Sequence, residues 1–160
     1  MITIFCGSFD PAHKGHLNTY LNARKLFQED IVVCICVNHL KSGLLSIEQR
    51  LDIAKSLFPT EKIEVFETKQ SIINLIQSAD RIIRGYRNQL DIEETIRIAS
   101  FYGVDSMRKK LSLIEIASQF SNISSTKIKE NFFVDKDYIE QSLNKKAIEI
   151  MSKVLKGEED

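Results

Sequence analysis

The segment Ile31–Val37 is apolar at every position, with no polar residue to mark a side that faces solvent. A strand that covers a single core alternates apolar and polar residues, whereas a run of this kind is typical of a parallel strand buried on both faces. Parallel strands need crossover connections, which are usually helices. Four further segments have strand-like sequences: Ile2–Cys6, Ile63–Phe66, Arg81–Ile83 and Leu111–Ala117.

Helical patterns fill the intervals between these segments. One helix is expected to begin near His13, with its inner side formed by Leu17, Tyr20, Leu21 and Phe27. A capping box of Ser46 with Gln49 starts the next helix, which is marked by Ile47, Leu51, Ala54 and Phe58. A short helix is expected at Ile72–Ile76. Asn88 can cap another, which Gly103 can end and which is marked by Ile92, Ile96 and Ala99.

This alternation predicts an α/β fold, namely a Rossmann-like open five-stranded parallel sheet with helices on both faces and right-handed crossovers. After the last strand, Ser124-Ser125-Thr126 has N-cap chemistry and leads into Lys127–Phe133. Helical patterns continue at Asp137–Leu143 and Lys145–Leu155. No linker or repeat divides the chain, so we expect residues 1–160 to form a single domain with a C-terminal helical tail at about 136–156.

The charge balance narrows the classes of partner. Lys plus Arg and Asp plus Glu both total 22, so the formal net charge is zero and broad attraction to nucleic acid or to an anionic membrane is not expected. Met1–Cys6 is too short for the apolar core of a signal peptide, and no apolar run approaches the roughly 18–20 residues that span a bilayer. We therefore expect a cytoplasmic protein whose three cysteines, Cys6, Cys34 and Cys36, are buried free thiols.

The string Gly7-Ser8-Phe9-Asp10-Pro11-Ala12-His13-Lys14-Gly15-His16 joins the first strand to the first helix. Gly7 permits a tight turn, and His13 and His16 share one face of the helix start, where N–H groups and the helix dipole favour phosphate. Imidazoles there can donate hydrogen bonds to phosphate oxygens as charge develops. The alternatives are a polar helix start with two surface histidines, or a zinc pair that lacks a third ligand, because His39 is the only other histidine.

Three later segments place phosphate-binding residues at the carboxyl ends of strands, where open α/β sheets bind ligands. Lys41 follows the second strand and can meet an acceptor phosphate, unless it is a solvated loop lysine. Arg84 and Arg87 flank a glycine between a strand and a helix, which suits phosphate; the alternative is an ion pair with Asp91 or Glu94. Phe120–Thr126 brings consecutive hydroxyls to a helix start, where they bind phosphate, cap the helix or do both.

The string His13-Lys14-Gly15-His16 resembles the H/T-x-G-H signature of the nucleotidylyltransferase superfamily. Taken in order from Ile2 to about Glu130, the four segments resemble the phosphopantetheine adenylyltransferase family. Its G-[ST]-F-D-P…G-H opening is matched by Gly7–His16, and its lysine after the second strand by Lys41. Its R-G-x-R is matched by Arg84–Arg87, its D-[FL]-E by Asp91 and Glu93, and its S-x-I-S-S-S by Ser121 with Ile123–Thr126.

The resemblance implies transfer of AMP from ATP to 4′-phosphopantetheine, which gives dephospho-coenzyme A and pyrophosphate in coenzyme A synthesis. It also implies direct attack of the acceptor phosphate on the α-phosphorus, Mg²⁺ bound through the ATP phosphates, no metal site of the protein's own, and a homohexamer. The catalytic residues it implies are His16, Lys41 and Arg87. The implied ATP-binding residues are Ser8, Phe9, His16, Gly85, Tyr86, Arg87, Thr95, Phe120, Ser121, Asn122, Ile123, Ser124, Ser125 and Thr126. The implied acceptor-binding residues are Ser8, Lys41, Ile72 and Arg84.

Some positions depart from the family's pattern. His13 stands where the family commonly has threonine, and Thr95 where it usually has a glutamate for the ATP ribose. Glu93 and Glu94 are the acidic neighbours that can replace that glutamate. Ile72 lies in a stretch that is shortened relative to the family.

Other functions share parts of this pattern. His13–His16 and Ile123–Thr126 resemble bacterial nicotinate-mononucleotide adenylyltransferase equally well, whereas Arg84–Arg87 and the chain length favour phosphopantetheine. A cytidylyltransferase would need an arginine where Ser118–Asn122 stand. From a different class, a catalytically idle nucleotide-binding homologue is favoured only by Thr95, because the other expected site residues are present.

Overall fold

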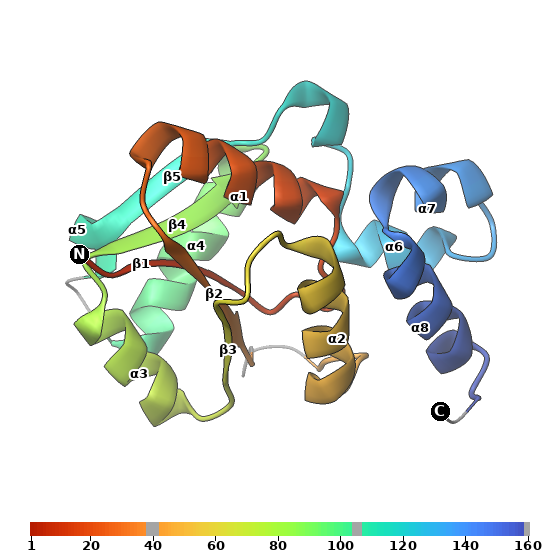
Figure 1. Cartoon of the computed structure of the whole chain (residues 1–160), viewed down its shortest axis with the longest axis horizontal. Coiled ribbons are helices and arrows are strands. Elements are labelled where there is room, and N and C mark those ends of the chain that lie inside the picture. Colours follow the sequence, from red (N-terminus) through yellow and green to blue (C-terminus); the bar gives the residue numbers. More distant parts are fainter. Residues whose placement is uncertain (38–41, 104–106, 159–160) are drawn as a thin grey trace.

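The structure is a computed structural model that describes residues 1–37, 42–103 and 107–158. Within them, strands form one sheet in the order β3-β2-β1-β4-β5, and all neighbouring strands are parallel (Figure 1). This confirms the predicted five-stranded α/β architecture. The strands are β1 (Thr3–Gly7), β2 (Ile31–Cys36), β3 (Ile63–Phe66), β4 (Arg81–Tyr86) and β5 (Leu111–Glu115).

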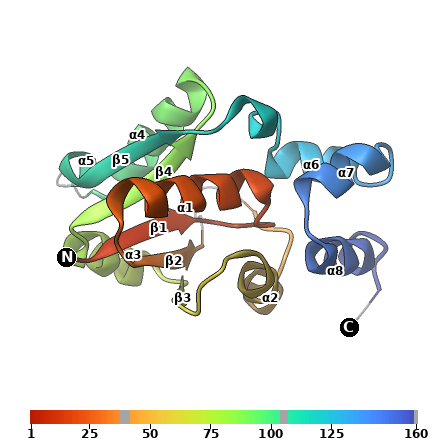
Figure 2. The same ribbon diagram turned by 45° about the horizontal axis from the view of Figure 1, so that its top comes forward.

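Helices cover both faces of this sheet. Helices α1 and α2 pack against one face, and α3, α4 and α5 pack against the other. Figure 2 shows α1 lying along the sheet, with α6, α7 and α8 beyond its end. The helices are α1 (Lys14–Phe27), α2 (Ile47–Leu57), α3 (Lys69–Ser78), α4 (Gln89–Tyr102), α5 (Met107–Lys110), α6 (Ser125–Asn131), α7 (Lys136–Ser142) and α8 (Lys145–Leu155).

The position of β2 explains why its sequence is apolar throughout. Val33 and Ile35 face the core that α1 and α2 complete. Cys34, between them, faces the second core, under α3 and α4. All three side chains are fully buried. Burying an aliphatic side chain of this size contributes about 1.5–3 kcal/mol, so a polar residue on either side of β2 would weaken one of the two cores.

Side-chain caps determine where the helices begin. His13 caps α1, and Ser46 with Gln49 forms the predicted capping box of α2. Asn88 caps α4 and Gly103 ends it in the left-handed region, as predicted. A further box of Thr68 with Ser71 starts α3 at Lys69 rather than at the predicted Ile72. Polar capping residues, rather than the apolar pattern, set that boundary.

Two features of the predicted elements are corrected. Strand β4 continues past Ile83 to Tyr86, because Arg84–Tyr86 pair with Leu113–Glu115 of β5. Leu21 and Ile96, predicted to face inward, are 47% and 40% exposed. The buried positions of α1 are Gly15, Thr19, Tyr20 and Ala23, and those of α4 are Thr95, Ala99 and Tyr102. Tyr20 and Ala99 are therefore confirmed, whereas small and polar residues take the place of Leu21 and Ile96 on the inner faces.

The C-terminal helices complete the core beside α2, at one end of the molecule (Figure 1). Ile139 and Leu143 of the α7 region, with Ala147 and Met151 of α8, belong to the same apolar cluster as α1 and α2. Helices α7 and α8 lie close to the predicted ranges. The tail therefore buries part of the main core.

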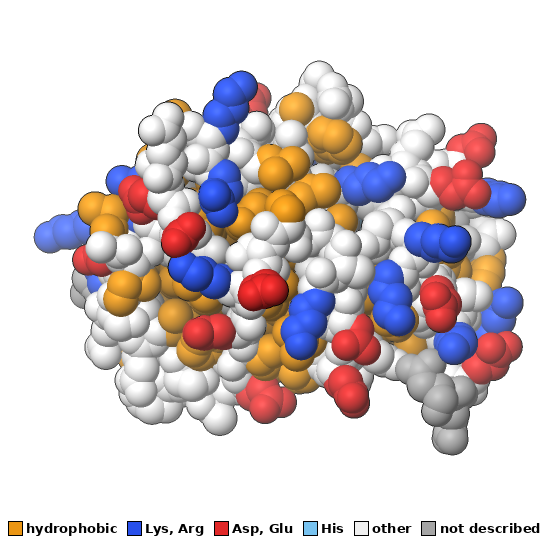
Figure 3. Space-filling model, viewed as in Figure 1, with side chains coloured by type: hydrophobic (Ala, Val, Ile, Leu, Met, Phe, Trp, Pro, Cys, Tyr) orange, Lys and Arg blue, Asp and Glu red, His pale blue; other side chains and the backbone are white. Residues whose placement is uncertain are grey.

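The charged side chains of the surface agree with the composition. Acidic and basic side chains are interspersed on the face shown in Figure 3, which fits a net charge of zero. No helix within the described residues is both long enough and apolar enough to cross a bilayer.

The chain order of the strands reverses between β1 and β4. From β1 the sheet continues to β2 and β3 on one side, and to β4 and β5 on the other. Ligands of open α/β sheets bind in the crevice outside the carboxyl ends of the strands at such a switch point. The loop after β1 and the end of β4 are therefore the places to look for a site.

Candidate active site

A cavity of about 640 Å³ lies at the carboxyl ends of β1 and β4. Its walls come from the start of α1, the end of β4, one face of α4 and the start of α6, so three of the four predicted segments meet there. The predicted site residues that line it are Ser8, His16, Ile72, Arg84, Gly85, Arg87, Thr95, Ile123, Ser124, Ser125 and Thr126. Lys41 lies outside the described residues.

Both histidines line the cavity and both also cap α1. His13 Nδ1 accepts the N–H of Gly15, and His16 Nδ1 accepts the N–H of His13, each at 3.1 Å. The two rings stack with their centroids 3.7 Å apart. The sequence predicts free helix N–H groups beside these rings, but two of those groups are taken by the imidazoles themselves.

These bonds fix the tautomer and leave one donor on each ring. Because Nδ1 accepts, the ring proton lies on Nε2. Burial and, secondarily, the charge of Arg87 lower the pKa of His13 to about 3. Burial, followed by His13 and the two arginines, lowers the pKa of His16 well below its usual 6.5. Within the described residues, every fully buried side-chain nitrogen or oxygen has a hydrogen-bond partner. The two Nε2–H groups bond to no protein acceptor in that part of the chain, so they are not fully buried. Because both rings line the cavity, these groups face it.

The glycines of the opening motif make room for aromatic rings. A Cβ on Gly15 would lie 2.9 Å from His13 Cε1, and a Cβ on Gly7 would lie 3.0 Å from the Phe9 ring. The positive φ of this turn belongs to Phe9, at 47°, rather than to Gly7. Phe9 is 1% exposed and meets the His16 ring edge-on, with centroids 4.9 Å apart. Its side chain therefore packs against His16 and does not line the cavity. The predicted contact of Phe9 with ATP would require a side chain in the cavity.

The two arginines are held on the strand side of the cavity. Arg84 Nη1 donates to the carbonyl of Cys6 at 2.9 Å, which fixes the side chain over β1. Arg87 forms the ion pair considered as the alternative to phosphate binding, because its Nε and Nη2 donate to both carboxylate oxygens of Asp91 at 2.8 Å. Its Nη1 donates to the carbonyl of Ile123 at 3.2 Å. These bonds leave part of the guanidinium's five donors for a ligand, so the ion pair is present and phosphate binding by Arg87 stays a prediction.

Thr95 and its acidic neighbours occupy distinct places. Thr95 is 2% exposed and its hydroxyl donates to the carbonyl of Asp91 at 3.1 Å. Glu94 lines the cavity beside it, whereas Glu93 is exposed and does not. Of the two carboxylates that the sequence offers in place of the family's glutamate, Glu94 is the one at the site.

The fourth segment divides at Ile123. Ser124 caps α6 by accepting the N–H of Lys127 at 3.1 Å, and Ile123–Thr126 line the cavity, so capping and lining coexist. Phe120, Ser121 and Asn122, predicted to bind ATP, do not line it. Ser118–Phe120 forms a 3₁₀ turn, in which the Ser121 hydroxyl donates to Ser118 and leaves the segment folded on itself. Tyr86, at the end of β4, also lies outside the cavity lining.

The sequence reasoning missed most of the apolar wall. Besides Ile72, this wall includes Ile76 of α3, Ile98 and Tyr102 of α4, and Met107 of α5. In the sequence, apolar residues of such helices indicate only a face that packs on a core. Cys6 and Cys36 are free thiols, as predicted, but they are half-buried and line the cavity, whereas Cys34 is buried. Nothing in their sequence context distinguishes a cavity wall from a core. No group of three or more His, Cys, Asp or Glu side chains in the described part of the chain is arranged to hold a metal ion.

Comparisons with known proteins show which family the chain belongs to. Residues 4–131 match the family model described as cytidylyltransferase-like. Phosphopantetheine adenylyltransferase of Clostridium novyi (strain NT) is 34% identical over 138 residues, which cover 81% of each chain. The enzymes of the same name from Clostridium perfringens (strain 13 / Type A) and Syntrophotalea carbinolica are 30% and 28% identical over 81% of this chain and 80% and 79% of their own.

A solved structure extends the likeness in fold. The crystal structure of Thermotoga maritima TmcAL bound with alpha-thio ATP matches with a TM-score of 0.63 and 13% identity, over 98% of this chain and 57% of that chain. At this identity the likeness concerns the fold alone, and this chain spans little more than half of that protein. From the matched family model and the curated relatives, the chain belongs to the cytidylyltransferase-like family and, within it, to the phosphopantetheine adenylyltransferases.

Proposed function

We propose that this chain transfers AMP from ATP to 4′-phosphopantetheine and releases dephospho-coenzyme A and pyrophosphate. The observation that carries the proposal is the meeting of two uncharged Nε2–H donors, His13 and His16, with Arg84 and Arg87 at the switch point of the sheet. Donors and fixed cations of this kind suit a phosphoryl group whose charge is redistributed during transfer. The named relatives support the choice of acceptor.

The reaction needs no covalent enzyme intermediate. An oxygen of the acceptor phosphate forms a bond to the α-phosphorus of ATP, and the bond from that phosphorus to the bridging oxygen of the β-phosphate breaks, so that the electron pair leaves with pyrophosphate. His16 Nε2–H is the donor proposed to stabilise the oxygens of the α-phosphoryl group. Arg87 lies beside it, near the start of α6, where the ATP phosphates are proposed to lie. The chain thus contributes position and charge stabilisation.

The acceptor is proposed to lie on the opposite side of the cavity. Ser8, Lys41 and Arg84 are the proposed phosphate contacts. The apolar wall of Ile72, Ile76 and Ile98 suits the largely uncharged pantetheine arm. Mg²⁺ is proposed to arrive through the ATP phosphate oxygens and to neutralise part of their charge, because phosphates supply the hard oxygen ligands that it prefers. The described residues offer it no cage of side chains.

A direct assay tests the proposal. The protein is incubated with ATP, Mg²⁺ and either 4′-phosphopantetheine or nicotinate mononucleotide, and pyrophosphate release is followed. We expect release with phosphopantetheine and none with the mononucleotide. Release with the mononucleotide alone would transfer the assignment to the other acceptor, and release with neither would leave an idle nucleotide-binding homologue.

We also propose, from the resemblance, that the enzyme works in the cytoplasm as a homohexamer. Sedimentation equilibrium of the purified chain checks the assembly. A monomer at micromolar concentration would contradict it.

A further inference from the structure

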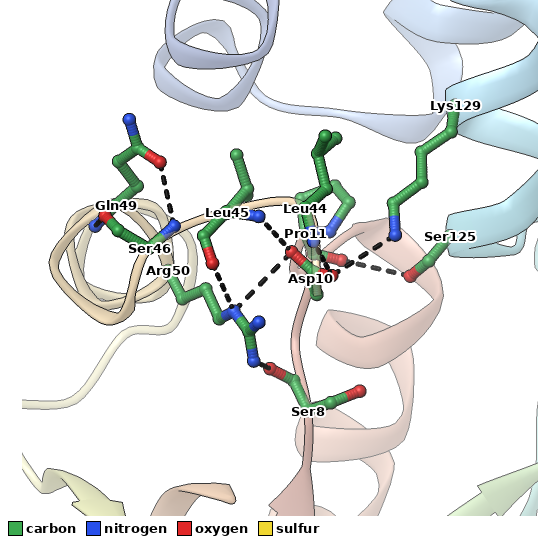
Figure 4. A network of polar contacts seen from close by, with 10 residues as sticks. All are labelled: Ser8, Asp10, Pro11, Leu44, Leu45, Ser46, Gln49, Arg50, Ser125 and Lys129. Carbon is green, nitrogen blue, oxygen red and sulfur yellow. Dashed lines mark hydrogen bonds and ion pairs between the residues drawn. The ribbon is translucent and has the colours of Figure 1, made fainter. Parts of the chain in front are cut away.

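A buried carboxylate outside the cavity ties together segments that form it. Asp10 is 7% exposed and does not line the cavity. Its Oδ1 accepts the N–H of Leu45 and its Oδ2 accepts the N–H of Leu44, both at 2.8 Å. Lys129 Nζ lies 3.2 Å from Oδ2, and Arg50 Nε lies 3.5 Å from Oδ1 (Figure 4).

The partners of Asp10 come from two parts of the chain. Leu44 and Leu45 lead into α2, which carries Arg50, and Lys129 belongs to α6. Asp10 itself lies in the opening loop, between Ser8 and the histidines. One carboxylate thus joins the opening loop, the approach to α2 and the helix whose start forms the far wall of the cavity.

Secondary contacts connect these partners to cavity residues. Arg50, which is 6% exposed, donates to the carbonyl of Leu45 at 3.1 Å and to that of Ser8 at 3.4 Å. The Ser125 hydroxyl donates to the carbonyl of Pro11 at 3.4 Å. Ser8 and Ser125 both line the cavity, Ser8 from the opening loop and Ser125 from the start of α6. Figure 4 shows Asp10 linked to Arg50 and Lys129, and the neighbouring Pro11 linked to Ser125.

The contacts of Asp10 with Arg50 and Lys129 depend on its negative charge. A neutral side chain there would leave Arg50 buried without a counter-charge, which is more costly than losing a neutral hydrogen bond. It would also weaken the charge-assisted bond to Lys129, one of the two direct links between the opening loop and α6 in Figure 4. Losing that link would let α6 shift relative to His16, and transfer reactions are sensitive to shifts of about 1 Å.

We propose that Asp10 is a positioning residue that sets the placement of the α6 start relative to Ser8 and the histidines, acting through Lys129 and Arg50. The inference rests on the proposed function, because it assigns the two sides of the cavity to the two reactants. Because Asp10 does not line the cavity, we expect it to act on alignment more than on ground-state binding.

The sharpest test removes only the α6 link. Lys129→Met keeps the aliphatic stem but deletes the charge, and Lys129→Arg restores a cation. Lys136→Met is the matched control, because Lys136 is 87% exposed and its nearest carboxylate oxygen, on Glu140, is 3.8 Å away. We expect Lys129→Met to lower kcat about tenfold with a smaller change in the KM for ATP, and Lys129→Arg and Lys136→Met to stay near wild type.

Stability must be separated from alignment. Denaturation midpoints are measured for each variant, and kinetics are recorded well below the lowest midpoint. A purely structural role would lower the midpoint of Lys129→Met while leaving kcat unchanged, and that result would overturn the inference. Asp10→Asn, where it folds, is expected to lower kcat further than Lys129→Met; wild-type turnover in Asp10→Asn would likewise overturn it.

The inference and the proposed function fail in different ways. Mg²⁺-ATP is titrated into every variant by calorimetry alongside the assay. If the wild type binds ATP but does not use phosphopantetheine, the acceptor assignment is wrong, and kcat is then compared with the acceptor that does react. If the wild type is active and Lys129→Met matches it, only the role of Asp10 is wrong. If the wild type binds no ATP, both the proposed function and the inference about Asp10 are wrong.

Discussion

His16 uses its two ring nitrogens for different tasks. Nδ1 accepts a helix N–H and holds the ring, while Nε2–H is available to the cavity. His13 has the same bonding pattern, but its role at the helix start can be filled by other capping residues. The two histidines should therefore respond differently to substitution.

His16→Ala is predicted to lower kcat by about a hundred- to a thousandfold, the usual effect of removing one donor aimed at developing charge. ATP affinity should change little, because the arginines and the α6 start remain. His13→Thr, which keeps a side-chain cap, is the matched variant for the helix start. Because His13→Thr also deletes one of the two proposed donors, its kcat is expected to fall, but less than that of His16→Ala. Steady-state kinetics with parallel ATP titration make the comparison, and an active His16→Ala would remove His16 from its assigned role.

The depressed histidine pKa values predict a loss of stability in acid. Below pH 6.5 the unfolded chain protonates its imidazoles, whereas the folded chain keeps His13 neutral until about pH 3. The stability that these groups contribute is therefore fully present above pH 6.5 and is lost as the pH falls toward 3, by about 1.4 kcal/mol per pH unit for each neutral buried ring. Urea unfolding at several pH values measures this. His13→Thr should have a shallower slope, and an equal slope in both proteins would contradict the assignment.

The packing of α1 on β4 depends on the absence of a side chain at Gly85. A Cβ on Gly85 would lie 2.5 Å from Thr19 Oγ1, so the missing side chain lets α1 approach the strand. Gly85→Ala is predicted to cost about 1–3 kcal/mol, as overpacking usually does, and to displace the helix that carries both histidines. Adding Thr19→Ala removes the clashing atom and should recover part of the loss. Denaturation of the single and double variants forms the cycle, and strict additivity would show that the two residues do not meet.

The sequence predicted elements well where local chemistry defines them. The Ser46–Gln49 box, the Asn88 cap and Gly103 each act within a few residues, and all were found in the structure. The end of β4 was placed too early, because Arg84 and Tyr86 are polar while their strand bonds depend on β5. The inner side of α1 was predicted correctly at Tyr20 but wrongly at Leu21, because the sheet surface, rather than the helix pattern, selects Ala23 as its neighbour.

Contacts between residues far apart in the sequence could not be predicted in the same way. Asp10 meets Leu44 and Lys129, which are 34 and 119 positions away, and no periodicity reports such pairs. The apolar cavity wall has the same spacing as a core face, so sequence alone cannot separate the two. Three of the four candidate phosphate-binding segments do meet at one cavity, because parallel strands deliver their ends to one edge of the sheet.

The matched family model ends at residue 131, yet the main core continues beyond it. Ile139, Leu143, Ala147 and Met151 are buried in that core, and burying each larger side chain contributes about 1.5–3 kcal/mol. A chain that stops after Asp135 is therefore predicted to lose most of a net stability that is typically about 5–15 kcal/mol. Thermal unfolding followed by circular dichroism tests this. A chain that stops after Lys156 is the control and should unfold like the full protein.

If the histidines have the proposed role, the capping of α1 by its own imidazoles links turnover to the opening of a single helical turn. If the first turn of α1 frays, both rings lose the bonds that orient them, so the open form of that turn has no aligned donor. Amide hydrogen exchange at Gly15 reports the same opening, because its N–H is held by His13. Solvent exchange at one backbone position thus becomes a measure of the inactive fraction of the enzyme, and a bound nucleotide that engages the rings should slow it.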